Sequence, residues 1–248
     1  MLEKIDGIIL KTQDFRETHK IVTIFGKHIG KFTAVARGAK KPKSRMAAIT
    51  QPFIYGTFLV YLRSGLGTIQ QGEIIESFRP IREDIYKTAY VAYLSELTYK
   101  ILEEKKPQDL LLNELYQTMH WIAEKEEVDI PMIMYELKMY EVGGFSPVLN
   151  MCVRCLSKQF PFAFSINEGG LLCQSCRHID DNALSLSDTL VKLFHLFQHV
   201  SLDRIGNISV KHENKLLFRR ILDAYYDHYG GYYLKSRRFL KQLKDLQG

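Results

Sequence analysis

The feature that most constrains this chain is the placement of its cysteines. All four lie between residues 152 and 176, as two Cys-x-x-Cys pairs with seventeen residues between them. A Cys-x-x-Cys turn brings two thiolates to one side of a tight loop, and two such turns can enclose one tetrahedral Zn²⁺. This spacing is typical of zinc sites, so the expected ligands are Cys152, Cys155, Cys173 and Cys176.

Four protein ligands would fill the coordination shell of zinc and leave no position for an activated water. We therefore expect one structural Zn²⁺ per chain, held in segment 150–180. An unmetallated pair of knuckles and a redox dithiol are the alternatives, and neither accounts easily for two matched pairs. His178 could replace a ligand, but four thiols leave it no vacancy.

The expected cellular compartment follows from the form of the N-terminus and from the apolar runs of the chain. The 248 residues contain no run of eighteen apolar residues, and the N-terminus "MLEKIDGIIL" does not have the form of a signal peptide. A cytoplasmic location is expected, where thiols stay reduced and metal ligation is favoured over disulfides.

Charge is unevenly distributed along the chain. Residues 1–80 carry thirteen Lys and Arg against six Asp and Glu, a net charge of +7, whereas residues 81–140 have a net charge of −5 and residues 141–248 one of +4. A strongly basic N-terminal third favours a polyanionic partner for that region.

The first eighty residues are predicted to form short strands. Five segments rich in β-branched and aromatic residues are separated by Gly or charged turns: "GIILKT", "KIVTIF", "GKFTAVAR", "FLVYLR" and "GTIQQGEIIES". Five strands in about eighty residues predict a small closed β-barrel of the OB-fold type, with an SH3-like barrel as the alternative.

Beyond Pro80 the apolar residues recur every three or four positions, the spacing of a helix. A first helix is expected after Pro80, with Tyr90, Leu94, Leu97 and Ile101 on one face and its end at "EEKKP". Further helices are expected at 108–126, from Pro131 to Gly143-Gly144, and in two segments after the cysteines, before a short basic helix "LKSRRFLKQLK". The expected fold is α+β and multidomain. Residues 1–80 would form an OB-fold nucleic-acid-binding domain, and residues 81–248 an α-helical domain with the zinc-ribbon-like segment 150–180 inserted.

A basic loop follows the third expected strand. The stretch "RGAKKPKSR", residues 37–45, holds five basic residues, and Gly38 and Pro42 exclude a regular helix or strand. Five unpaired cations are too costly to bury, and OB barrels bind single strands in cationic grooves. The loop is therefore interpreted as a phosphate-binding element, with a solvated tip of no function as the alternative. The expected DNA-binding residues are Lys31, Arg37, Lys40, Lys41, Lys43 and Arg45.

Aromatic side chains near this loop are candidates for base stacking. Phe53, Tyr55 and Tyr61 fit that role, although burial in the barrel is the ordinary alternative for each. A second basic surface, for DNA or for an acidic partner, is expected from residues in the C-terminal third: Arg219, Arg220, Lys235, Arg237, Arg238 and Lys241. A solvated helix face explains those residues equally well.

Taken together, these stretches resemble the RecO family of bacterial recombination-mediator and repair proteins. The segment from "GIILKTQDF" to "KKPKSR" is similar to its OB domain, "YEVGGFSPVLNMCVRC" and "GGLLCQSC" to its helical-domain signature and zinc pairs, and "YYLKSRRFL" to its closing motif. Two departures are minor. Gly26 stands where the family often has Thr, and Leu156 replaces the Gly that usually follows the first cysteine pair.

The resemblance implies a non-enzymatic DNA-binding protein of the RecF repair pathway. It implies binding to single- and double-stranded DNA, annealing of complementary strands, and work with RecR to load RecA onto strands coated by the single-strand-binding protein SSB. The acidic C-terminal tail of SSB is expected on the helical domain, and the nucleoid is the implied location. A zinc-dependent nucleic-acid-processing enzyme and a scaffold for acidic tails are the alternative functions.

Overall fold

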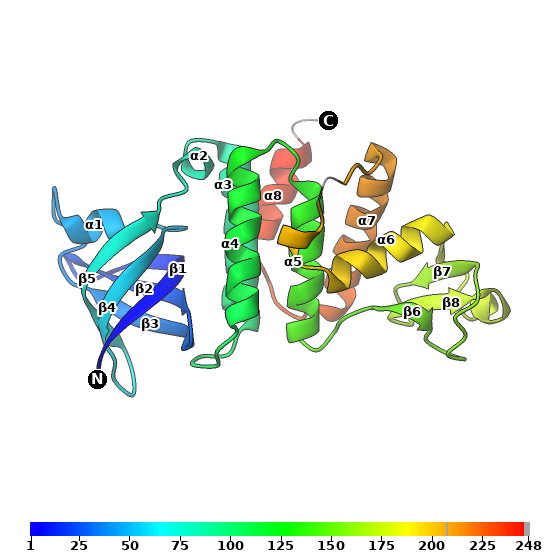
Figure 1. Ribbon diagram of the computed structural model, residues 1–248, viewed down its shortest axis with the longest axis horizontal. Helices are drawn as coiled ribbons and strands as arrows, with labels where there is room; N and C mark the ends of the chain where they lie inside the picture. The colour runs from blue at the N-terminus through cyan, green and yellow to red at the C-terminus, as the bar shows by residue number, and fades with distance from the viewer. Residues whose placement is uncertain (207, 246–248) are drawn as a thin grey trace. The chain divides into compact units, whose positions relative to one another are not determined.

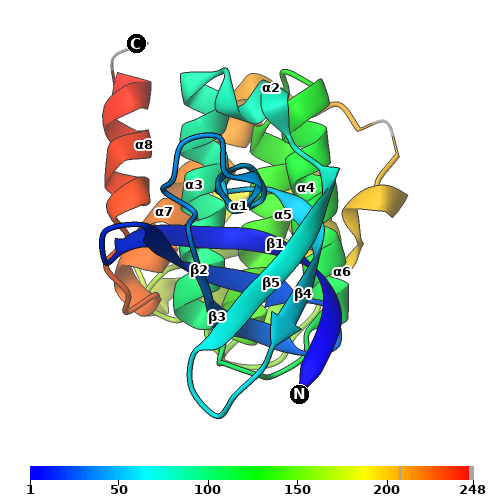
Figure 2. The ribbon, with the colours of Figure 1, turned by 90° about the vertical axis from the view of Figure 1, so that its left-hand side faces the viewer.

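The N-terminal strands form a closed barrel in the computed structural model, which describes residues 1–206 and 208–245 (Figure 1). Its strands are β1 (Leu2–Phe15), β2 (His19–Gly26), β3 (Gly30–Ala36), β4 (Tyr55–Tyr61) and β5 (Gly67–Glu76), in the order β1-β2-β3-β5-β4. Among the barrel strands of the described residues, only β3 and β5 pair in parallel, and the short helix α1 (Arg45–Ile49) connects β3 to β4 (Figure 2). The predicted OB-fold is confirmed.

Alternation along β3 explains how the barrel closes around its core. Phe32, Ala34 and Ala36 are buried inside, whereas Thr33 and Val35 face outward and are partly exposed. The long strand β1 bends at a register shift after Ile9, so that its first half pairs with β4 and its second half with β2. This bend lets one strand belong to both sides of the barrel.

The helices begin and end close to the positions that the sequence predicts. They are α2 (Arg79–Arg82), α3 (Ile85–Ile101), α4 (Asp109–Glu124), α5 (Asp129–Val142), α6 (Asp188–His199), α7 (His212–Tyr229) and α8 (Lys235–Asp245). The Asp84 carboxylate caps α3 by accepting from the backbone N–H groups of Tyr86 and Lys87. None of the helices in the described ranges is long and apolar enough to cross a membrane.

The cysteine segment forms a small sheet between α5 and α6. It contains β6 (Val148–Cys152), β7 (Phe162–Ser165), β8 (Gly170–Cys173) and β9 (Leu184–Leu186), in the order β6-β8-β7-β9, with the 3₁₀ turn Gln174–Ile179 after β8. The β7–β8 hairpin pairs Phe162 with Cys173. The predicted ribbon-like insertion in the helical part is thus confirmed.

The chain divides into two compact units, and the boundary between them does not coincide with the change from strands to helices near residue 80. One unit contains Met1–Glu126 together with the segment that begins at Leu234, and the other contains Glu127–Tyr233. The first unit therefore combines the barrel with α2, α3, α4 and α8. The second combines α5, α6 and α7 with the cysteine sheet.

Candidate nucleic-acid interface and cysteine cluster

The basic loop, residues 37–45, is held to the barrel through its backbone. Gly38 adopts φ +70° and its N–H donates to His19 Nδ1 at 3.1 Å, while the N–H of Lys40 donates to the Thr18 carbonyl at 3.0 Å. A turn follows, in which the N–H of Lys41 donates to the Gly38 carbonyl. The main chain is therefore fixed against the β1–β2 turn, and the basic side chains are left to face outward.

Four of the loop's five cations are exposed and unpaired. Arg37, Lys41, Lys43 and Arg45 lie at the surface, and none of them forms a salt bridge within the described ranges. Lys40 differs, because its Nζ lies 2.8 Å from Asp14 Oδ2, and their hydrogen bond lowers the pKa of the Asp14 carboxyl. A phosphate would have to compete with Asp14 for Lys40, but not for the other four residues.

Lys31 lies away from this surface. Its side chain is buried, its Nζ donates to the Tyr99 carbonyl at 2.6 Å, and the same nitrogen lies 4.9 Å from the centre of the Tyr99 ring. Burial lowers the pKa of Lys31, opposed by the nearby Glu104 carboxylate. The residue therefore joins the barrel to α3, and we do not include it in the phosphate-binding surface.

Two further cations belong beside the loop although sequence reasoning did not select them. Arg16 is exposed in the β1–β2 turn with φ 54°, and its guanidinium lies 5.2 Å from the centre of the Phe15 ring. Lys20 opens β2 within electrostatic range of Asp14. The acidic residues of "QDFRETHK" offset Arg16 and Lys20 in a charge count. The hydrogen bonds from Lys40 to Thr18 and from Gly38 to His19 show that the turn and the loop are neighbours.

The three aromatic candidates are placed differently from one another. Phe53 is buried, and Tyr55 packs on the ring of Tyr116 with centroids 5.0 Å apart. Tyr61 is 41% exposed, and the Arg63 guanidinium lies 5.2 Å from its ring centre. Of the three, only Tyr61 presents a ring surface that a base could reach.

The four cysteines meet at one point. All their Sγ atoms lie within 4.8 Å of one another, and the Sγ atoms of Cys155 and Cys173 are 3.5 Å apart. Tetrahedral zinc with Zn–S bonds near 2.3 Å places sulfur atoms about 3.8 Å apart. The chain thus brings together a set of thiols with the spacing that a single metal ion requires. His178 is exposed and is not a member of this set.

The cysteines of the cluster differ in how readily they form thiolates. Burial raises the pKa of Cys152, but hydrogen bonds from the backbone N–H groups of Cys155, Cys173 and Arg154 lower it, with a net pKa of about 6. Burial and the neighbouring thiols raise the pKa of Cys176 to about 12. One thiolate forms readily and a fourth does not, so four thiolates together require a cation among them.

The turn after the first cysteine pair contains a strained residue. Leu156 adopts φ 61°, a left-handed conformation that favours glycine, and its N–H donates to the Cys152 carbonyl at 3.0 Å. The Arg154 guanidinium also pairs with Glu168 of the β7–β8 hairpin. The ion pair joins the first cysteine turn to the hairpin whose strand β8 ends at Cys173.

The second basic group is divided between the two compact units. Arg219 is buried in α7, where its guanidinium pairs with the Glu136 carboxylate of α5. Arg220 is exposed on the same helix, whereas the remaining members lie on α8 in the other compact unit. Lys235, Arg238 and Lys241 are exposed and Arg237 is half-buried. Arg219 is therefore a core ion pair, and α8 carries most of the accessible charge.

Comparison with known proteins matches almost the whole chain. The family model described as "Recombination protein O N terminal" matches residues 1–78, and "Recombination protein O C terminal" matches residues 82–238. Curated relatives carry the name "DNA repair protein RecO". That of Oceanobacillus iheyensis is 59% identical over 98% of this chain and 94% of its own length, and that of Bacillus pumilus is 47% identical over 100% and 96%. That of Halalkalibacterium halodurans is 44% identical over 99% and 97%.

Proposed function

Because this chain belongs to the RecO family of DNA repair proteins, we propose that it is a DNA-binding recombination mediator. In this role it binds single- and double-stranded DNA, anneals complementary strands and, with RecR, helps to load RecA onto SSB-coated single strands in the RecF pathway. The observation that carries the proposal is the group of four exposed, unpaired cations in the basic loop.

Annealing places two polyanions side by side, so the protein has to neutralise phosphates on both. The basic loop supplies one cationic surface, with Arg16 beside it, and exposed residues of α8 supply another. Cations that neutralise phosphates release counterions, which supplies most of the binding free energy at low salt. Base pairing then provides the driving force for annealing, and the activity requires no nucleotide hydrolysis.

We propose that the cysteine cluster holds one Zn²⁺ in a structural role. The ligands would be the four cysteines, and the metal would supply only the positive charge that keeps four thiolates together. The residues around it act on the sulfur atoms, by donating N–H groups and by fixing the turns. The second compact unit thereby gains a rigid sheet beside α6.

The acidic C-terminal tail of SSB is proposed to bind a basic surface of this chain. Arg220 and the exposed residues Lys235, Arg238 and Lys241 can receive carboxylates, whereas buried Arg219 cannot. Action with RecR and RecA at the bacterial nucleoid is part of the same proposal, and it follows from the family rather than from any surface described here.

Salt-dependent DNA binding tests the proposal. The triple variant Arg37→Ala/Lys41→Ala/Lys43→Ala should weaken binding to a single-stranded oligonucleotide and lower the slope of log affinity against log salt by about 2, since each lost phosphate contact removes about 0.7. Lys40→Ala should change the slope by less than the ~0.7 expected for one lost phosphate contact, because Asp14 already pairs with that lysine. Fluorescence anisotropy over a range of salt concentrations measures both slopes.

Lys27→Ala is the matched control. Lys27 is exposed in the β2–β3 turn, at the opposite end of β3 from the loop, so its removal should leave the slope unchanged. An unaltered slope in the triple variant would refute the role of the loop. Annealing of SSB-coated complementary strands without nucleotide, measured on the same proteins, tests the mediator activity itself.

A further inference from the structure

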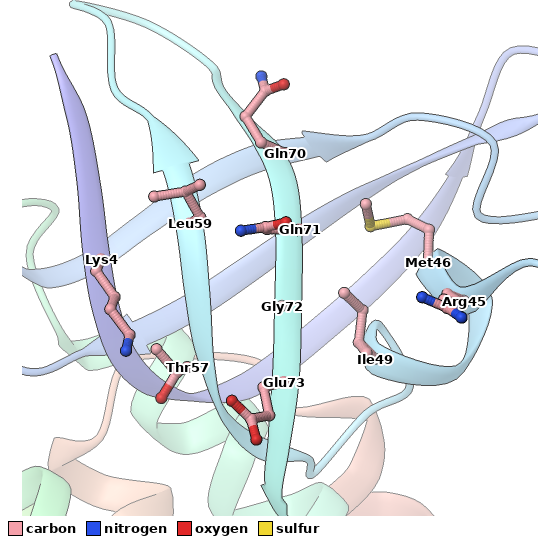
Figure 3. A pocket seen from close by; sticks show the side chains of 10 residues that line it. All are labelled: Lys4, Arg45, Met46, Ile49, Thr57, Leu59, Gln70, Gln71, Gly72 and Glu73. Carbon is pink, nitrogen blue, oxygen red and sulfur yellow. The ribbon is translucent and has the colours of Figure 1, made fainter.

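A groove runs beside the basic loop on the outer surface of the barrel. It has a volume of about 580 Å³ and lies between α1 and the strands β1, β4 and β5 (Figure 3). Arg45 belongs both to the loop and to the groove lining. A strand whose phosphates lie along the loop would therefore reach the groove at Arg45.

The register of the strands explains how the groove is lined. Lys4 of β1 pairs with Leu59 of β4, and Leu59 pairs with Gln71 of β5, so these three side chains form one row across the outer face. Figure 3 shows Gln71 over β5, with Leu59 on one side and Met46 on the other. The lining is thus apolar on two sides, with an amide between them.

Two glutamine side chains of the lining are free to bind a ligand, whereas the Thr57 hydroxyl already donates to Asp6 Oδ1. Neither Gln70 nor Gln71 has a hydrogen bond from its side chain within the described ranges, and both residues are exposed. A glutamine amide offers a donor beside an acceptor, which is the pattern that the edge of an unpaired base presents. The volume lies in the range of small-molecule sites and exceeds what a single base requires.

Charge favours a nucleotide over a peptide as the occupant. Lys4 and Arg45 place cations at two sides of the groove, and the lining has a single acid, Glu73, on β5. A carboxylate there can accept a hydrogen bond from an exocyclic amine of a base. Continuity with a loop of unpaired cations points to a ligand that has phosphates at regular intervals.

We propose that this groove receives one unpaired base of a DNA strand whose phosphates lie on the basic loop. This inference rests on the proposed function and adds to it a preference for unpaired nucleotides. Leu59, Met46 and Ile49 contact the faces of the base, and the amides of Gln70 and Gln71 bind its edge. A base within a duplex cannot enter, because its edge is already paired.

Three probes of about 20 nucleotides test the groove: a single strand, the same phosphate backbone without bases, and a hairpin duplex without unpaired ends. The variant Gln70→Ala/Gln71→Ala removes no charge. It should weaken binding to the single strand roughly 5- to 30-fold, the effect of two lost hydrogen bonds, with an unchanged salt slope. Affinity for the abasic strand and for the hairpin should stay within about twofold of the wild type.

Leu59→Trp, which fills the groove, should reproduce this pattern, and Gln51→Ala, an exposed glutamine outside the groove, should not. Equal losses of affinity for all three probes would overturn the inference. So would an unchanged affinity for the single strand, which is the result expected if the groove binds a peptide. If the wild-type protein binds none of the probes, the proposed function itself fails, which is a different outcome from selective failure of the groove variants.

Discussion

Lys31 illustrates how burial changes the role of a basic residue. It is 8% exposed, and its ammonium group is satisfied by the Tyr99 carbonyl and the Tyr99 ring. In the sequence it lies six residues before Arg37 in the same basic region, and nothing in the local pattern distinguishes the two. The difference arises from α3, which covers one end of β3 and leaves the other end exposed.

Lys31 should leave a signature in the pH dependence of stability. Its folded-state pKa is lowered by burial, so below pH 10.5 the unfolded chain binds more protons at this site and stability rises with pH toward 10.5. The free energy of unfolding of the wild type, minus that of Lys31→Met, should therefore increase between pH 8 and pH 10. Urea denaturation at both pH values measures this difference.

The comparison with Lys31→Met removes contributions from other groups that titrate over the same range. A wild-type advantage over Lys31→Met that shrinks as the pH rises would contradict the assignment.

At the scale of elements, the β2–β3 turn is fixed against the loop between α3 and α4. The Lys105 N–H donates to the Lys31 carbonyl at 2.8 Å, and the His28 N–H donates to Asp109 Oδ1 at 2.7 Å. Gly30 makes this approach feasible, because a Cβ at that position would lie 2.1 Å from the Lys106 carbonyl oxygen. The barrel is thereby joined to the helices of its own unit at the end opposite the basic loop.

Replacing Gly30 tests this contact. Gly30→Ala should lower the free energy of unfolding by more than Gly38→Ala does. Both glycines have positive φ, +77° and +70°, so backbone strain is similar, but only Gly30 meets a backbone carbonyl, whereas the nearest atom at Gly38 is the Lys41 side chain at 3.7 Å. Thermal and urea unfolding of the two variants measures the difference. Equal destabilisation would show that the close approach contributes nothing.

The elements themselves were largely predictable from sequence. Period-2 alternation located the strands, as Phe32, Ala34 and Ala36 show, and the two cysteine pairs specified a common site before any geometry was known. The ion pairs that determine which basic residues are available to a ligand were not predictable. The Lys40–Asp14 and Arg219–Glu136 pairs join residues 26 and 83 positions apart, and no local pattern records such distances.

At the scale of the whole molecule, the candidate phosphate-binding loop and the cysteine cluster belong to different compact units. Their roles should therefore be separable. Structural zinc contributes directly to folding, so its loss affects first the unit that contains the thiols. The proposed DNA binding through the loop depends instead on the barrel.

Cys173→Ser tests this separation. The variant should lose bound zinc and unfold at a lower temperature than the wild type, because a three-thiolate set holds the metal less tightly. At a temperature where it remains folded, its affinity for a single-stranded oligonucleotide should stay within about twofold. Metal analysis, circular dichroism and anisotropy provide the three measurements.

Ser175→Ala, at an exposed position between Cys173 and Cys176, is the control and should retain zinc, melting temperature and affinity. A large loss of DNA affinity in folded Cys173→Ser would instead place the cysteine sheet on the DNA-binding surface.

The return of the chain to its first unit has a consequence for synthesis. Helix α8 packs on α3, and the Glu96 carboxylate accepts hydrogen bonds from the backbone N–H and hydroxyl of Ser236 at the start of α8. The ribosome makes the barrel and α3 early, yet their last packing partner is translated only after the entire second unit. A nascent or truncated chain that stops before Leu234 leaves this side of α3 bare, so that completion of the earliest-made unit waits for the latest-made helix.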